Sequence, residues 1–461
     1  MQKVLIANRG EIAVRIIRAC HDLGLQTVAI YSQVDSEALH VLHADEAICV
    51  GEPPSQKSYL KIPNILSACE ITGADAIHPG YGFLSENANF ASICESCGVN
   101  FIGPSPASIA LLGDKSKAKA TAKSVKCPII TGSDGIIEDP QEGLKEAKRL
   151  GFPVFIKASA GGGGKGIRIA YNADEFIRQF SAARAEAEVS FNNPDVYLER
   201  MIVNPRHIEV QVIGDKHGNY VYLGERDCTI QRRRQKLIEE APSPILTPAL
   251  RKKIGEAAVA IVKAAGYYSL GTVEFLLDQE KNFYFMEVNT RIQVEHTITE
   301  ELTGIDLARE QIRIAMGEKL SFKQKDIEYK GHVIQFRINA ENPSNNFAPS
   351  PGKLEYYIPP GGPHVRVDSA CYSGYKIPPN YDSMIAKLIV KGSNRAEAIA
   401  IAKRALREFH IGGVHSTISF HQYMLQDKRF LENDYVITYI DQLIGEGCLF
   451  QPKAHDKSHD S

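Results

Sequence analysis

The chain contains no tryptophan and has no excess of either charge. Its 53 Lys and Arg residues against 55 Asp and Glu give a net charge of −2, so we predict no nucleic-acid partner and no binding to an anionic membrane. No apolar run is long enough to cross a membrane, and the opening MQKVLIANRG lacks the pattern of a signal peptide.

Cysteine is scattered rather than paired. The nine cysteines are odd in number, which is typical of a protein in a reducing compartment, and we predict a cytoplasmic location. Cys94 and Cys97 have C-x-x-C spacing, but no second pair stands at the spacing of a zinc site. We interpret these two residues as buried thiols in a helix.

The 461 residues are 44% hydrophobic, which is enough for about two to four domains. Residues 1–113 alternate apolar strands with amphipathic helices, the pattern of a parallel sheet covered on both faces. Residues 130–203 and 331–446 read as α+β segments, and the end from Gln451 as a polar tail. We predict a multidomain α/β and α+β protein.

The polar motif EVNTRIQVEH at 287–296 follows an apolar strand. In an extended chain, alternation would place five polar side chains on one face: Glu287, Asn289, Arg291, Gln293 and Glu295. Such a face is too polar for a core, so we predict a functional site here rather than a solvated edge strand.

A second acidic strand comes before this motif. Glu274 interrupts the apolar run 271–277, where a buried carboxylate is costly without a partner. The short connection would pair the two strands as a hairpin and bring Glu274 near Glu287. Oxygen ligands from Glu274, Glu287 and Asn289 suit Mg²⁺, so we predict a magnesium site.

Lys157 interrupts an apolar strand that leads into the glycines at 161–164, and a further strand follows at 167–170. Glycine N–H groups can approach phosphate closely, which predicts a mobile phosphate-binding hairpin. It is not a Walker loop, because G-K-[ST] and a following helix are missing. Lys115 stands in a lysine-rich helix, where the residues alone favour a solvated face.

Three further features leave their roles open. His78 and Glu86 occupy a Gly/Pro-rich loop after a strand, where catalysis, packing and helix capping are all possible. The cationic run 226–236 favours an anionic small substrate over nucleic acid, given the balanced net charge. Arg337 lies in an apolar strand and therefore needs an anion or a carboxylate partner.

Seven motifs in order resemble the biotin carboxylase family: GDK at 113–115, KASAGGGGKG at 157–166, RHIEVQV at 206–212, ERDCTIQRR at 225–233, QKLIEEAPSP at 235–244, EVNTRIQVEH at 287–296 and QFRINAE at 335–341. The resemblance extends from ANRGEIA to PNYDSMIAKL at 379–388. It implies an ATP-grasp fold. The implied parts are a Rossmann-like domain at 1–113, an ATP-grasp domain at 114–330 with a glycine-rich lid at 130–203, a C-terminal α+β domain at 331–446 and a polar tail at 447–461.

The resemblance implies carboxylation of biotin by bicarbonate and ATP through carboxyphosphate, giving ADP and phosphate. ATP, Mg²⁺ or Mn²⁺, and biotin on a carrier protein would be required. The chain is most similar to the biotin carboxylase component of acetyl-CoA carboxylase, which serves fatty acid synthesis. Implied partners are a biotin carboxyl carrier protein, carboxyltransferase subunits and a second copy in a homodimer. No Met-Lys-Met acceptor motif occurs, so we expect the biotin to be on a separate protein.

The resemblance also assigns roles by position. The implied ATP-binding residues are Lys115, Lys157, Gly162, Gly163, Gly164, Glu199, His207, Gln231, Arg234, Glu274 and Glu287. The implied metal ligands are Glu274, Glu287 and Asn289, and the implied bicarbonate-binding residues are Lys236, Arg291, Gln293 and Val294. Glu295 is implied as the catalytic base and Arg337 as the residue that stabilises biotin, with Lys236 and Arg291 also catalytic.

The chain departs from the family pattern at Lys165, Arg200, Arg234 and Thr297, and the last replaces a proline and is expected to loosen its turn. Two other functions remain to be weighed. One is an ATP-grasp ligase that joins a carboxylate to an amine. The other is a non-enzymatic nucleotide-binding subunit, which would predict a damaged metal or base position, whereas all these positions are intact.

Overall fold

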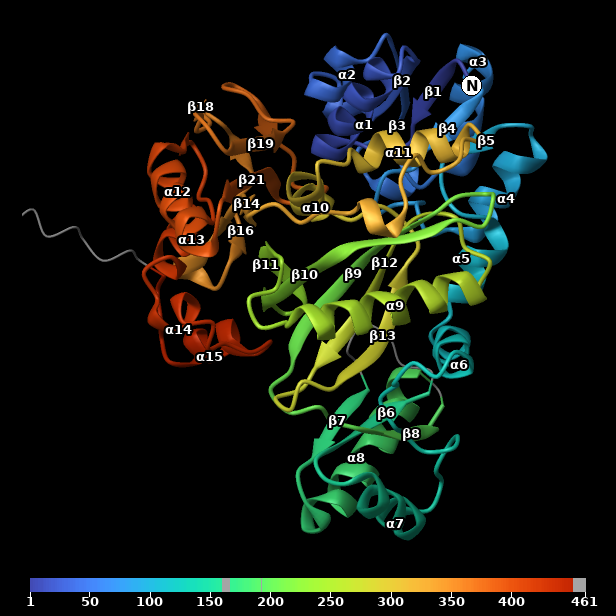
Figure 1. The fold of residues 1–461 in the computed structure, drawn as a ribbon, viewed down its shortest axis with the longest axis vertical. Coiled ribbons are helices and arrows are strands. Elements are labelled where there is room, and N and C mark those ends of the chain that lie inside the picture. Colours follow the sequence, from blue (N-terminus) through green and yellow to red (C-terminus); the bar gives the residue numbers. More distant parts are fainter. Residues whose placement is uncertain (160–165, 192, 451–461) are drawn as a thin grey trace, which may run out of the picture. The chain divides into compact units, whose positions relative to one another are not determined.

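The computed structural model describes residues 1–159, 166–191 and 193–450 (Figure 1). The predicted glycine hairpin, with Gly162, Gly163, Gly164 and Lys165, therefore lies outside the described residues, as does the tail from Gln451. The chain divides into two compact units. Unit 1 comprises 1–125, 206–275 and 287–461, and unit 2 comprises 126–205 and 276–286.

Unit 1 begins with a parallel sheet of five strands in the order β3-β2-β1-β4-β5, as the alternating pattern predicts. The strands are β1 (Lys3–Ile6), β2 (Gln26–Ser32), β3 (Glu46–Gly51), β4 (Ala76–His78) and β5 (Asn100–Phe101). The covering helices are α1 (Gly10–Asp22), α3 (Ile62–Thr72), α4 (Ala88–Ser96) and α5 (Pro106–Gly113). Apolar side chains pack on both faces of the sheet, and its central strands β1 and β4 are almost fully buried, whereas the edge strand β3 is largely exposed.

The second sheet has eight strands in the order β13-β12-β9-β10-β11-β14-β21-β19. These are β9 (Arg206–Gly214), β10 (Tyr220–Arg232), β11 (Gln235–Ala241), β12 (Ser269–Leu277), β13 (Phe283–Asn289), β14 (His332–Asn339), β19 (Val365–Ser369) and β21 (Met384–Gly392). Strand β11 pairs directly with β14, so the predicted segments 114–330 and 331–446 contribute strands to one sheet. Polar side chains on the same face of neighbouring strands of this sheet can therefore contact one another.

The two acidic strands, β12 and β13, are neighbours, which confirms the predicted hairpin. The predicted polar face, however, is only partly extended. Strand β13 ends at Asn289, and helix α10 (His296–Thr303) begins seven residues later. Arg291, Gln293 and Glu295 thus lie in the irregular segment between β13 and α10, where strand alternation does not apply.

Several boundaries depend on features that are not evident from local patterns. Helix α10 is followed by a separate helix, α11 (Leu307–Ala315), because Gly304 ends α10 in a left-handed conformation. The Pro/Gly-rich loops at 343–363 and 373–380 contain short strands whose pairing no local pattern indicates: β16 (Ala348–Pro349), β17 (Gly352–Lys353), β18 (Tyr356–Ile358) and β20 (Lys376–Ile377). Cys94 is buried as predicted, but Cys97 caps its helix and is exposed.

Helices cover the remaining surfaces of unit 1. They are α6 (Lys115–Ser124), α9 (Pro248–Ala264), α12 (Arg395–Glu408), α13 (Ile418–Met424), α14 (Lys428–Leu431) and α15 (Tyr439–Gly445). Helix α12 packs with α13 on a large apolar core that also includes β14 and β21. Within the residues that the structure describes, no helix is long and apolar enough to cross a membrane.

Unit 2 contains a three-stranded antiparallel sheet in the order β7-β6-β8, with β6 (Val154–Ala158), β7 (Ile167–Ala170) and β8 (Val196–Arg200). Helices α7 (Pro140–Leu150) and α8 (Ala173–Phe191) pack on it around Phe176 and Phe180. The register pairs Lys157 with Ile167, so the strands on either side of the glycine run do form a hairpin.

Candidate active site

Lys236, at the start of β11, is surrounded by three carboxylates from three other parts of the chain. Its Nζ atom lies 2.5 Å from Glu209, 3.0 Å from Glu274 and 2.6 Å from Glu295. Burial alone would lower the pKa of Lys236, but these carboxylates raise it well above its ordinary value. The ammonium group therefore stays charged and holds the three acids in one place.

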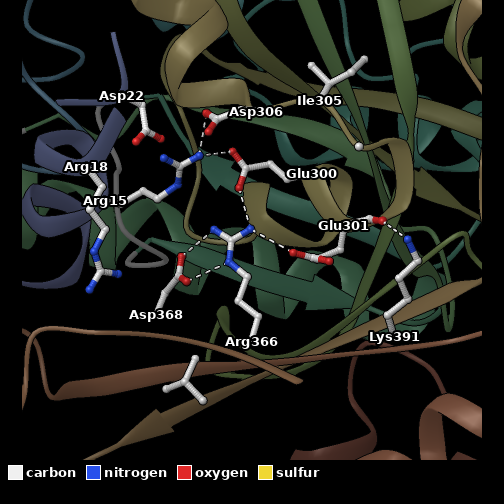
Figure 2. Close-up of a pocket in the computed structure, with 12 residues that line it drawn as sticks. Arg15, Arg18, Asp22, Glu300, Glu301, Ile305, Asp306, Arg366, Asp368 and Lys391 are labelled. Carbon is white, nitrogen blue, oxygen red and sulfur yellow. Dashed lines mark hydrogen bonds and ion pairs between the residues drawn. The ribbon is translucent and has the colours of Figure 1, made fainter. Parts of the chain in front are cut away.

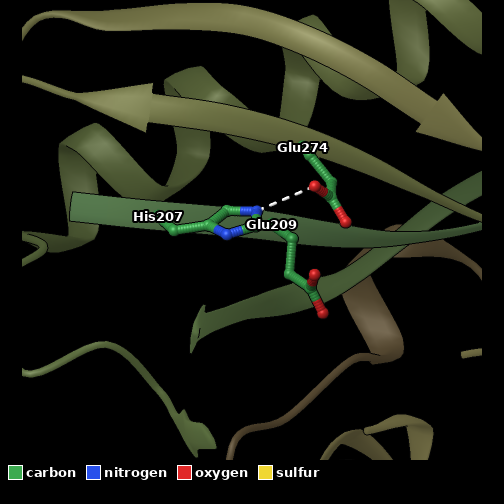
Figure 3. Close-up of side chains that lie close together, drawn as sticks. All are labelled: His207, Glu209 and Glu274. Carbon is green, nitrogen blue, oxygen red and sulfur yellow. Dashed lines mark hydrogen bonds and ion pairs between the residues drawn. The ribbon is translucent and has the colours of Figure 1, made fainter. Parts of the chain in front are cut away.

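His207, Glu209 and Glu274 lie close together on β9 and β12 (Figure 3). His207 Nε2 is 2.9 Å from a Glu274 oxygen, and Gln231 lies 3.1 Å from the other ring nitrogen. Glu209 also pairs with Arg226 at 2.5 Å. Glu209 is already paired with Arg226 and Lys236, so this trio is better explained as part of an ion-pair network than as a metal site of its own.

Glu295 bridges two cations, with Oε1 on Lys236 and Oε2 at 2.9 Å from Arg337 Nη2. Burial would raise the pKa of Glu295, but Lys236, Arg337 and Arg226 outweigh it and hold the pKa well below its ordinary value. Glu295 is therefore ionised and its carboxylate is fixed in orientation, as a base must be.

Arg337 has the carboxylate partner that its position in an apolar strand predicts. Its Nε donates to Glu239 at 2.5 Å, and its backbone carbonyl accepts from Thr417 and from His421, each at 2.8 Å. Glu239 also accepts from Gln335 at 3.0 Å. Both the side chain and the main chain of Arg337 are thus held before any substrate arrives.

Thr297 does not loosen its turn, contrary to expectation. It is fully buried in the first turn of α10, and its hydroxyl donates to the side chain of Gln335. Gln335 in turn donates to Glu239, the carboxylate partner of Arg337. The threonine therefore adds a polar tie between α10 and β14 that a proline, which has no hydroxyl, cannot make.

The three predicted metal ligands lie together at the end of the β12–β13 pair. Asn289 Nδ2 donates to Glu274 at 2.8 Å, and Glu287 is partly exposed, with Lys115 at 3.8 Å. Burial and the nearby charge of Glu274 raise the pKa of Glu287. A divalent cation would relieve this repulsion, and two carboxylates with an amide oxygen are a fitting donor set for Mg²⁺.

Arg291 is oriented by Glu86, which accepts from its Nε at 2.9 Å and from the backbone N–H of Thr290 at 3.0 Å. The sequence left the role of Glu86 open, and in the structure Glu86 positions the turn after β13. His78 instead lies fully buried and accepts from the N–H of Gly80, and burial lowers its pKa to about 3. Its role is packing.

The cationic run is not one surface. Arg226 is fully buried and donates to Gln211, Thr272, Thr299 and Gln293 in addition to Glu209. Only the turn between β10 and β11, at Arg233 and Arg234, is exposed, and both residues have positive φ. Arg234, a predicted ATP contact, therefore lies on a solvent-facing turn.

Unit 2 contains two of the predicted nucleotide contacts. Lys157 on β6 and Glu199 on β8 form an ion pair between adjacent strands. Glu199 is buried and the Lys157 side chain is 21% exposed. The ion pair therefore fixes the direction of a lysine side chain that is only partly exposed.

Glu209, Arg226 and Glu239 belong to the site but were not assigned a role from the sequence. The motif RHIEVQV predicts a half-buried strand with a polar environment, whereas β9 is buried along its whole length. Two acidic or amide side chains, Glu209 and Gln211, thus lie inside the protein. The alternation of polar and β-branched residues in this motif was the available signal in the sequence. The cations that pair with Glu209 come from other strands, Arg226 from β10 and Lys236 from β11, so the motif by itself did not identify them.

A charged cavity of about 560 Å³ lies elsewhere in unit 1 (Figure 2). It is lined by four cations, Arg15, Arg18, Arg366 and Lys391, and by five acids, Asp22, Glu300, Glu301, Asp306 and Asp368. None of the predicted site residues lines it. Figure 2 shows Arg366 between Asp368, Glu300 and Glu301, so the charges of this cavity neutralise one another.

Known families match most of the chain. Residues 1–109 match "Biotin carboxylase, N-terminal domain", residues 114–323 match "Carbamoyl-phosphate synthase L chain, ATP binding domain", and residues 335–442 match "Biotin carboxylase C-terminal domain". The second description names an ATP-binding domain, and it covers Lys236, Glu274 and Glu287.

Two curated relatives and one solved structure illustrate the similarity. A biotin carboxylase from Nostoc is 55% identical, over 96% of this chain and 99% of its own. A pyruvate carboxylase subunit from Methanothermobacter thermautotrophicus is 52% identical, over 95% and 89%. The biotin carboxylase domain dimer of Hydrogenobacter thermophilus 2-oxoglutarate carboxylase, in complex with MgADP, ADP and bicarbonate, is 49% identical, with a TM-score of 0.89 and 98% coverage of both chains. The chain therefore belongs to the biotin carboxylase family, the ATP-grasp enzymes that carboxylate biotin with ATP and bicarbonate.

Proposed function

We propose that this protein phosphorylates bicarbonate with ATP and transfers the resulting carboxyl group to biotin, using the residues gathered around Lys236 and Glu295. The observation that carries this proposal is the ionised Glu295 held between Lys236 and Arg337. A fixed base beside two cations suits an anionic substrate that must lose a proton.

Bicarbonate is the proposed partner of Arg291, Gln293, Val294 and Lys236. Cations beside the anion favour its deprotonation, and the carboxylate of Glu295 takes the proton as the bicarbonate oxygen attacks the terminal phosphoryl group of ATP. The products are carboxyphosphate and ADP. Arg226 Nη2 donates to Gln293 Oε1 at 3.2 Å, so a buried charge holds the turn that would contact bicarbonate.

Arg337 is the proposed biotin residue. Carboxyphosphate gives up phosphate, the released phosphate takes the proton of the biotin ring N–H, and the carboxyl carbon forms the new C–N bond with that nitrogen. In the enolate form of biotin, the ring oxygen carries negative charge that must be stabilised. A guanidinium fixed by Glu239 on one side can present its remaining N–H groups to that oxygen without reorganising.

ATP and its metal complete the proposed set. Lys115, His207 and Gln231 in unit 1, and Lys157 and Glu199 in unit 2, are proposed nucleotide contacts, together with the glycine run and Arg234. Glu274, Glu287 and Asn289 would hold Mg²⁺ or Mn²⁺. Bound there, the metal would neutralise charge on the transferring phosphoryl group.

The test is an assay of ADP release with and without bicarbonate and free biotin, combined with transfer of labelled bicarbonate carbon to biotin. We expect ADP release to need bicarbonate, and label on biotin to need ATP. ATP cleavage that needs an amine and a carboxylate instead would favour the alternative ATP-grasp ligase. Nucleotide binding without any turnover would favour the non-enzymatic role.

We also propose that the physiological acceptor is biotin on a carrier protein and that the final reaction belongs to acetyl-CoA carboxylase. The Nostoc relative is named a biotin carboxylase, which fits this assignment, and the pyruvate carboxylase relative supports pyruvate as the second candidate. Purified carrier proteins from both systems should be compared at equal concentration. Faster carboxylation of the pyruvate carboxylase carrier would overturn the first choice.

A homodimer is proposed as the working form, because the Hydrogenobacter domain is described as a dimer. Light scattering should then give twice the 50.9 kDa of one chain. A mass of one chain at assay concentration would contradict the homodimer but would not test the proposed reaction.

A further inference from the structure

Lys387 on β21 is a fully buried lysine to which no role was assigned from sequence. Its Nζ donates to the backbone carbonyl of Val294 at 3.1 Å and lies 2.9 Å from Glu11. Val294 stands in the turn between β13 and α10, immediately before Glu295. A charged side chain thus reaches from another part of the sheet to the main chain of the proposed bicarbonate turn.

The sheet register explains why Lys387 can reach this turn. Lys387 is directly opposite Arg337 on β14 and directly opposite Asp368 on β19, so the three side chains form one row on the same face. Arg337 contacts the Glu295 carboxylate, and Lys387 contacts the carbonyl of the preceding residue. Two adjacent cations therefore hold two adjacent residues of the turn.

Three other carbonyls of this turn have local partners. The carbonyl of Ile292 accepts from Arg291, that of Gln293 accepts from His296, and that of Glu295 accepts from Ile298. The Val294 carbonyl instead accepts from a strand 93 residues away. That contact joins the turn to the sheet, whereas the local bonds only shape it.

The lysine is itself fixed by acids on two sides. Glu11 of α1 accepts from the hydroxyl of Tyr81, and Asp368 is held by Arg366 through two hydrogen bonds of 2.8 Å, as Figure 2 shows. Asp368 lies 3.9 Å from Lys387 Nζ. A buried charge with these partners has little freedom, which suits a group whose role is orientation.

We propose that Lys387 is a positioning residue for bicarbonate: its contact with the Val294 carbonyl sets the backbone of residues 293–295, and with it the direction of Gln293 and Glu295. This inference rests on the proposed function. It adds a residue that touches no substrate and acts through the turn. Loss of the contact should therefore weaken bicarbonate use more than ATP binding.

The test compares Lys387→Met with Lys391→Met. Lys391 lies four residues further on the same strand, and it donates at 2.6 Å to the carbonyl of Glu301, outside the bicarbonate turn. For Lys387→Met we expect a KM for bicarbonate raised by about tenfold or more with the Kd for ATP unchanged, because small misplacements of reacting groups are costly. For Lys391→Met we expect both values to stay near those of the wild type.

Hydrogen exchange supplies a readout that does not need activity. The amides of residues 293–296 should exchange faster in Lys387→Met and not in Lys391→Met, so this arm still decides the inference if the wild type lacks bicarbonate-dependent turnover. Should Lys387→Met fail to fold, the double variant Glu11→Gln with Lys387→Met removes the stranded acid and keeps an acceptor for Tyr81. An unchanged KM for bicarbonate with unchanged exchange, or equal losses in ATP and bicarbonate affinity, overturns the proposal.

Discussion

The guanidinium of Arg337 donates to the carboxylate of Glu295 at 2.9 Å, across 42 residues of sequence. The proposed biotin residue and the proposed base are therefore joined before either substrate binds. This arrangement orients both groups, and it also means that a change at one should alter the other.

Glu295→Gln keeps the size of the side chain, replaces one of its two acceptor oxygens by an N–H donor, and cannot accept a proton. We expect bicarbonate-dependent ADP release to fall by about 10²-fold or more, because a positioned general base contributes at least that much. The affinity for ATP, measured by calorimetry, should change little. Parallel losses of ATP binding and turnover would assign Glu295 a structural role instead.

Glu287→Gln removes one charge from the proposed metal site. ATP turnover should fall by roughly 10²-fold because the metal loses a charged ligand and stabilises the phosphoryl group less well. The matched control is Glu280→Gln, in the exposed turn between β12 and β13, which should behave as wild type. Near-normal turnover of Glu287→Gln over a range of Mg²⁺ concentrations would remove this residue from the metal site.

Thr297→Val keeps the shape of the side chain and removes the hydroxyl that donates to Gln335. A buried acceptor left without its donor costs about 1–3 kcal/mol, so the free energy of unfolding should fall by that amount. The KM for biotin should also rise, because Gln335 helps to fix the partner of Arg337. Thr303→Val, in the same helix but bonded to the carbonyl of Thr299 and the backbone N–H of Ile305 rather than to Gln335, is the control and should leave the KM unchanged.

His421 should stay neutral down to low pH. Burial lowers its pKa to about 4, and its Nε2 donates to the carbonyl of Arg337. The unfolded chain binds a proton near pH 6.5 that the folded chain does not, so this group lowers the free energy of unfolding as pH falls from 6.5 towards 4.

The test of this prediction is urea unfolding at pH 7 and 5.5. The loss of stability between these values should be smaller in His421→Gln by about 1 kcal/mol, because the titrating group is gone. NMR of the imidazole should also show a neutral ring at pH 5.5. A ring that is protonated at that pH would contradict the structural explanation.

Local patterns predicted much of the fold correctly. The alternation of apolar strands and amphipathic helices in residues 1–113 indicated a parallel sheet because side-chain periodicity reflects which faces are buried. The pairing of the two acidic strands that contain Glu274 and Glu287 followed from a short connection. The seven motifs indicated the family, and the matches over nearly the whole chain confirm it.

The tertiary structure decided which charges meet. Lys236 contacts Glu209, Glu274 and Glu295, and Lys387 contacts Glu11 and Val294, through strands far apart in sequence. A single sequence contains each residue type and its periodicity, but a buried ion pair depends on sheet order and register. Those are set by the packing of the whole chain, so the base and the metal ligands could be suggested from motifs, whereas the cations that hold them could not.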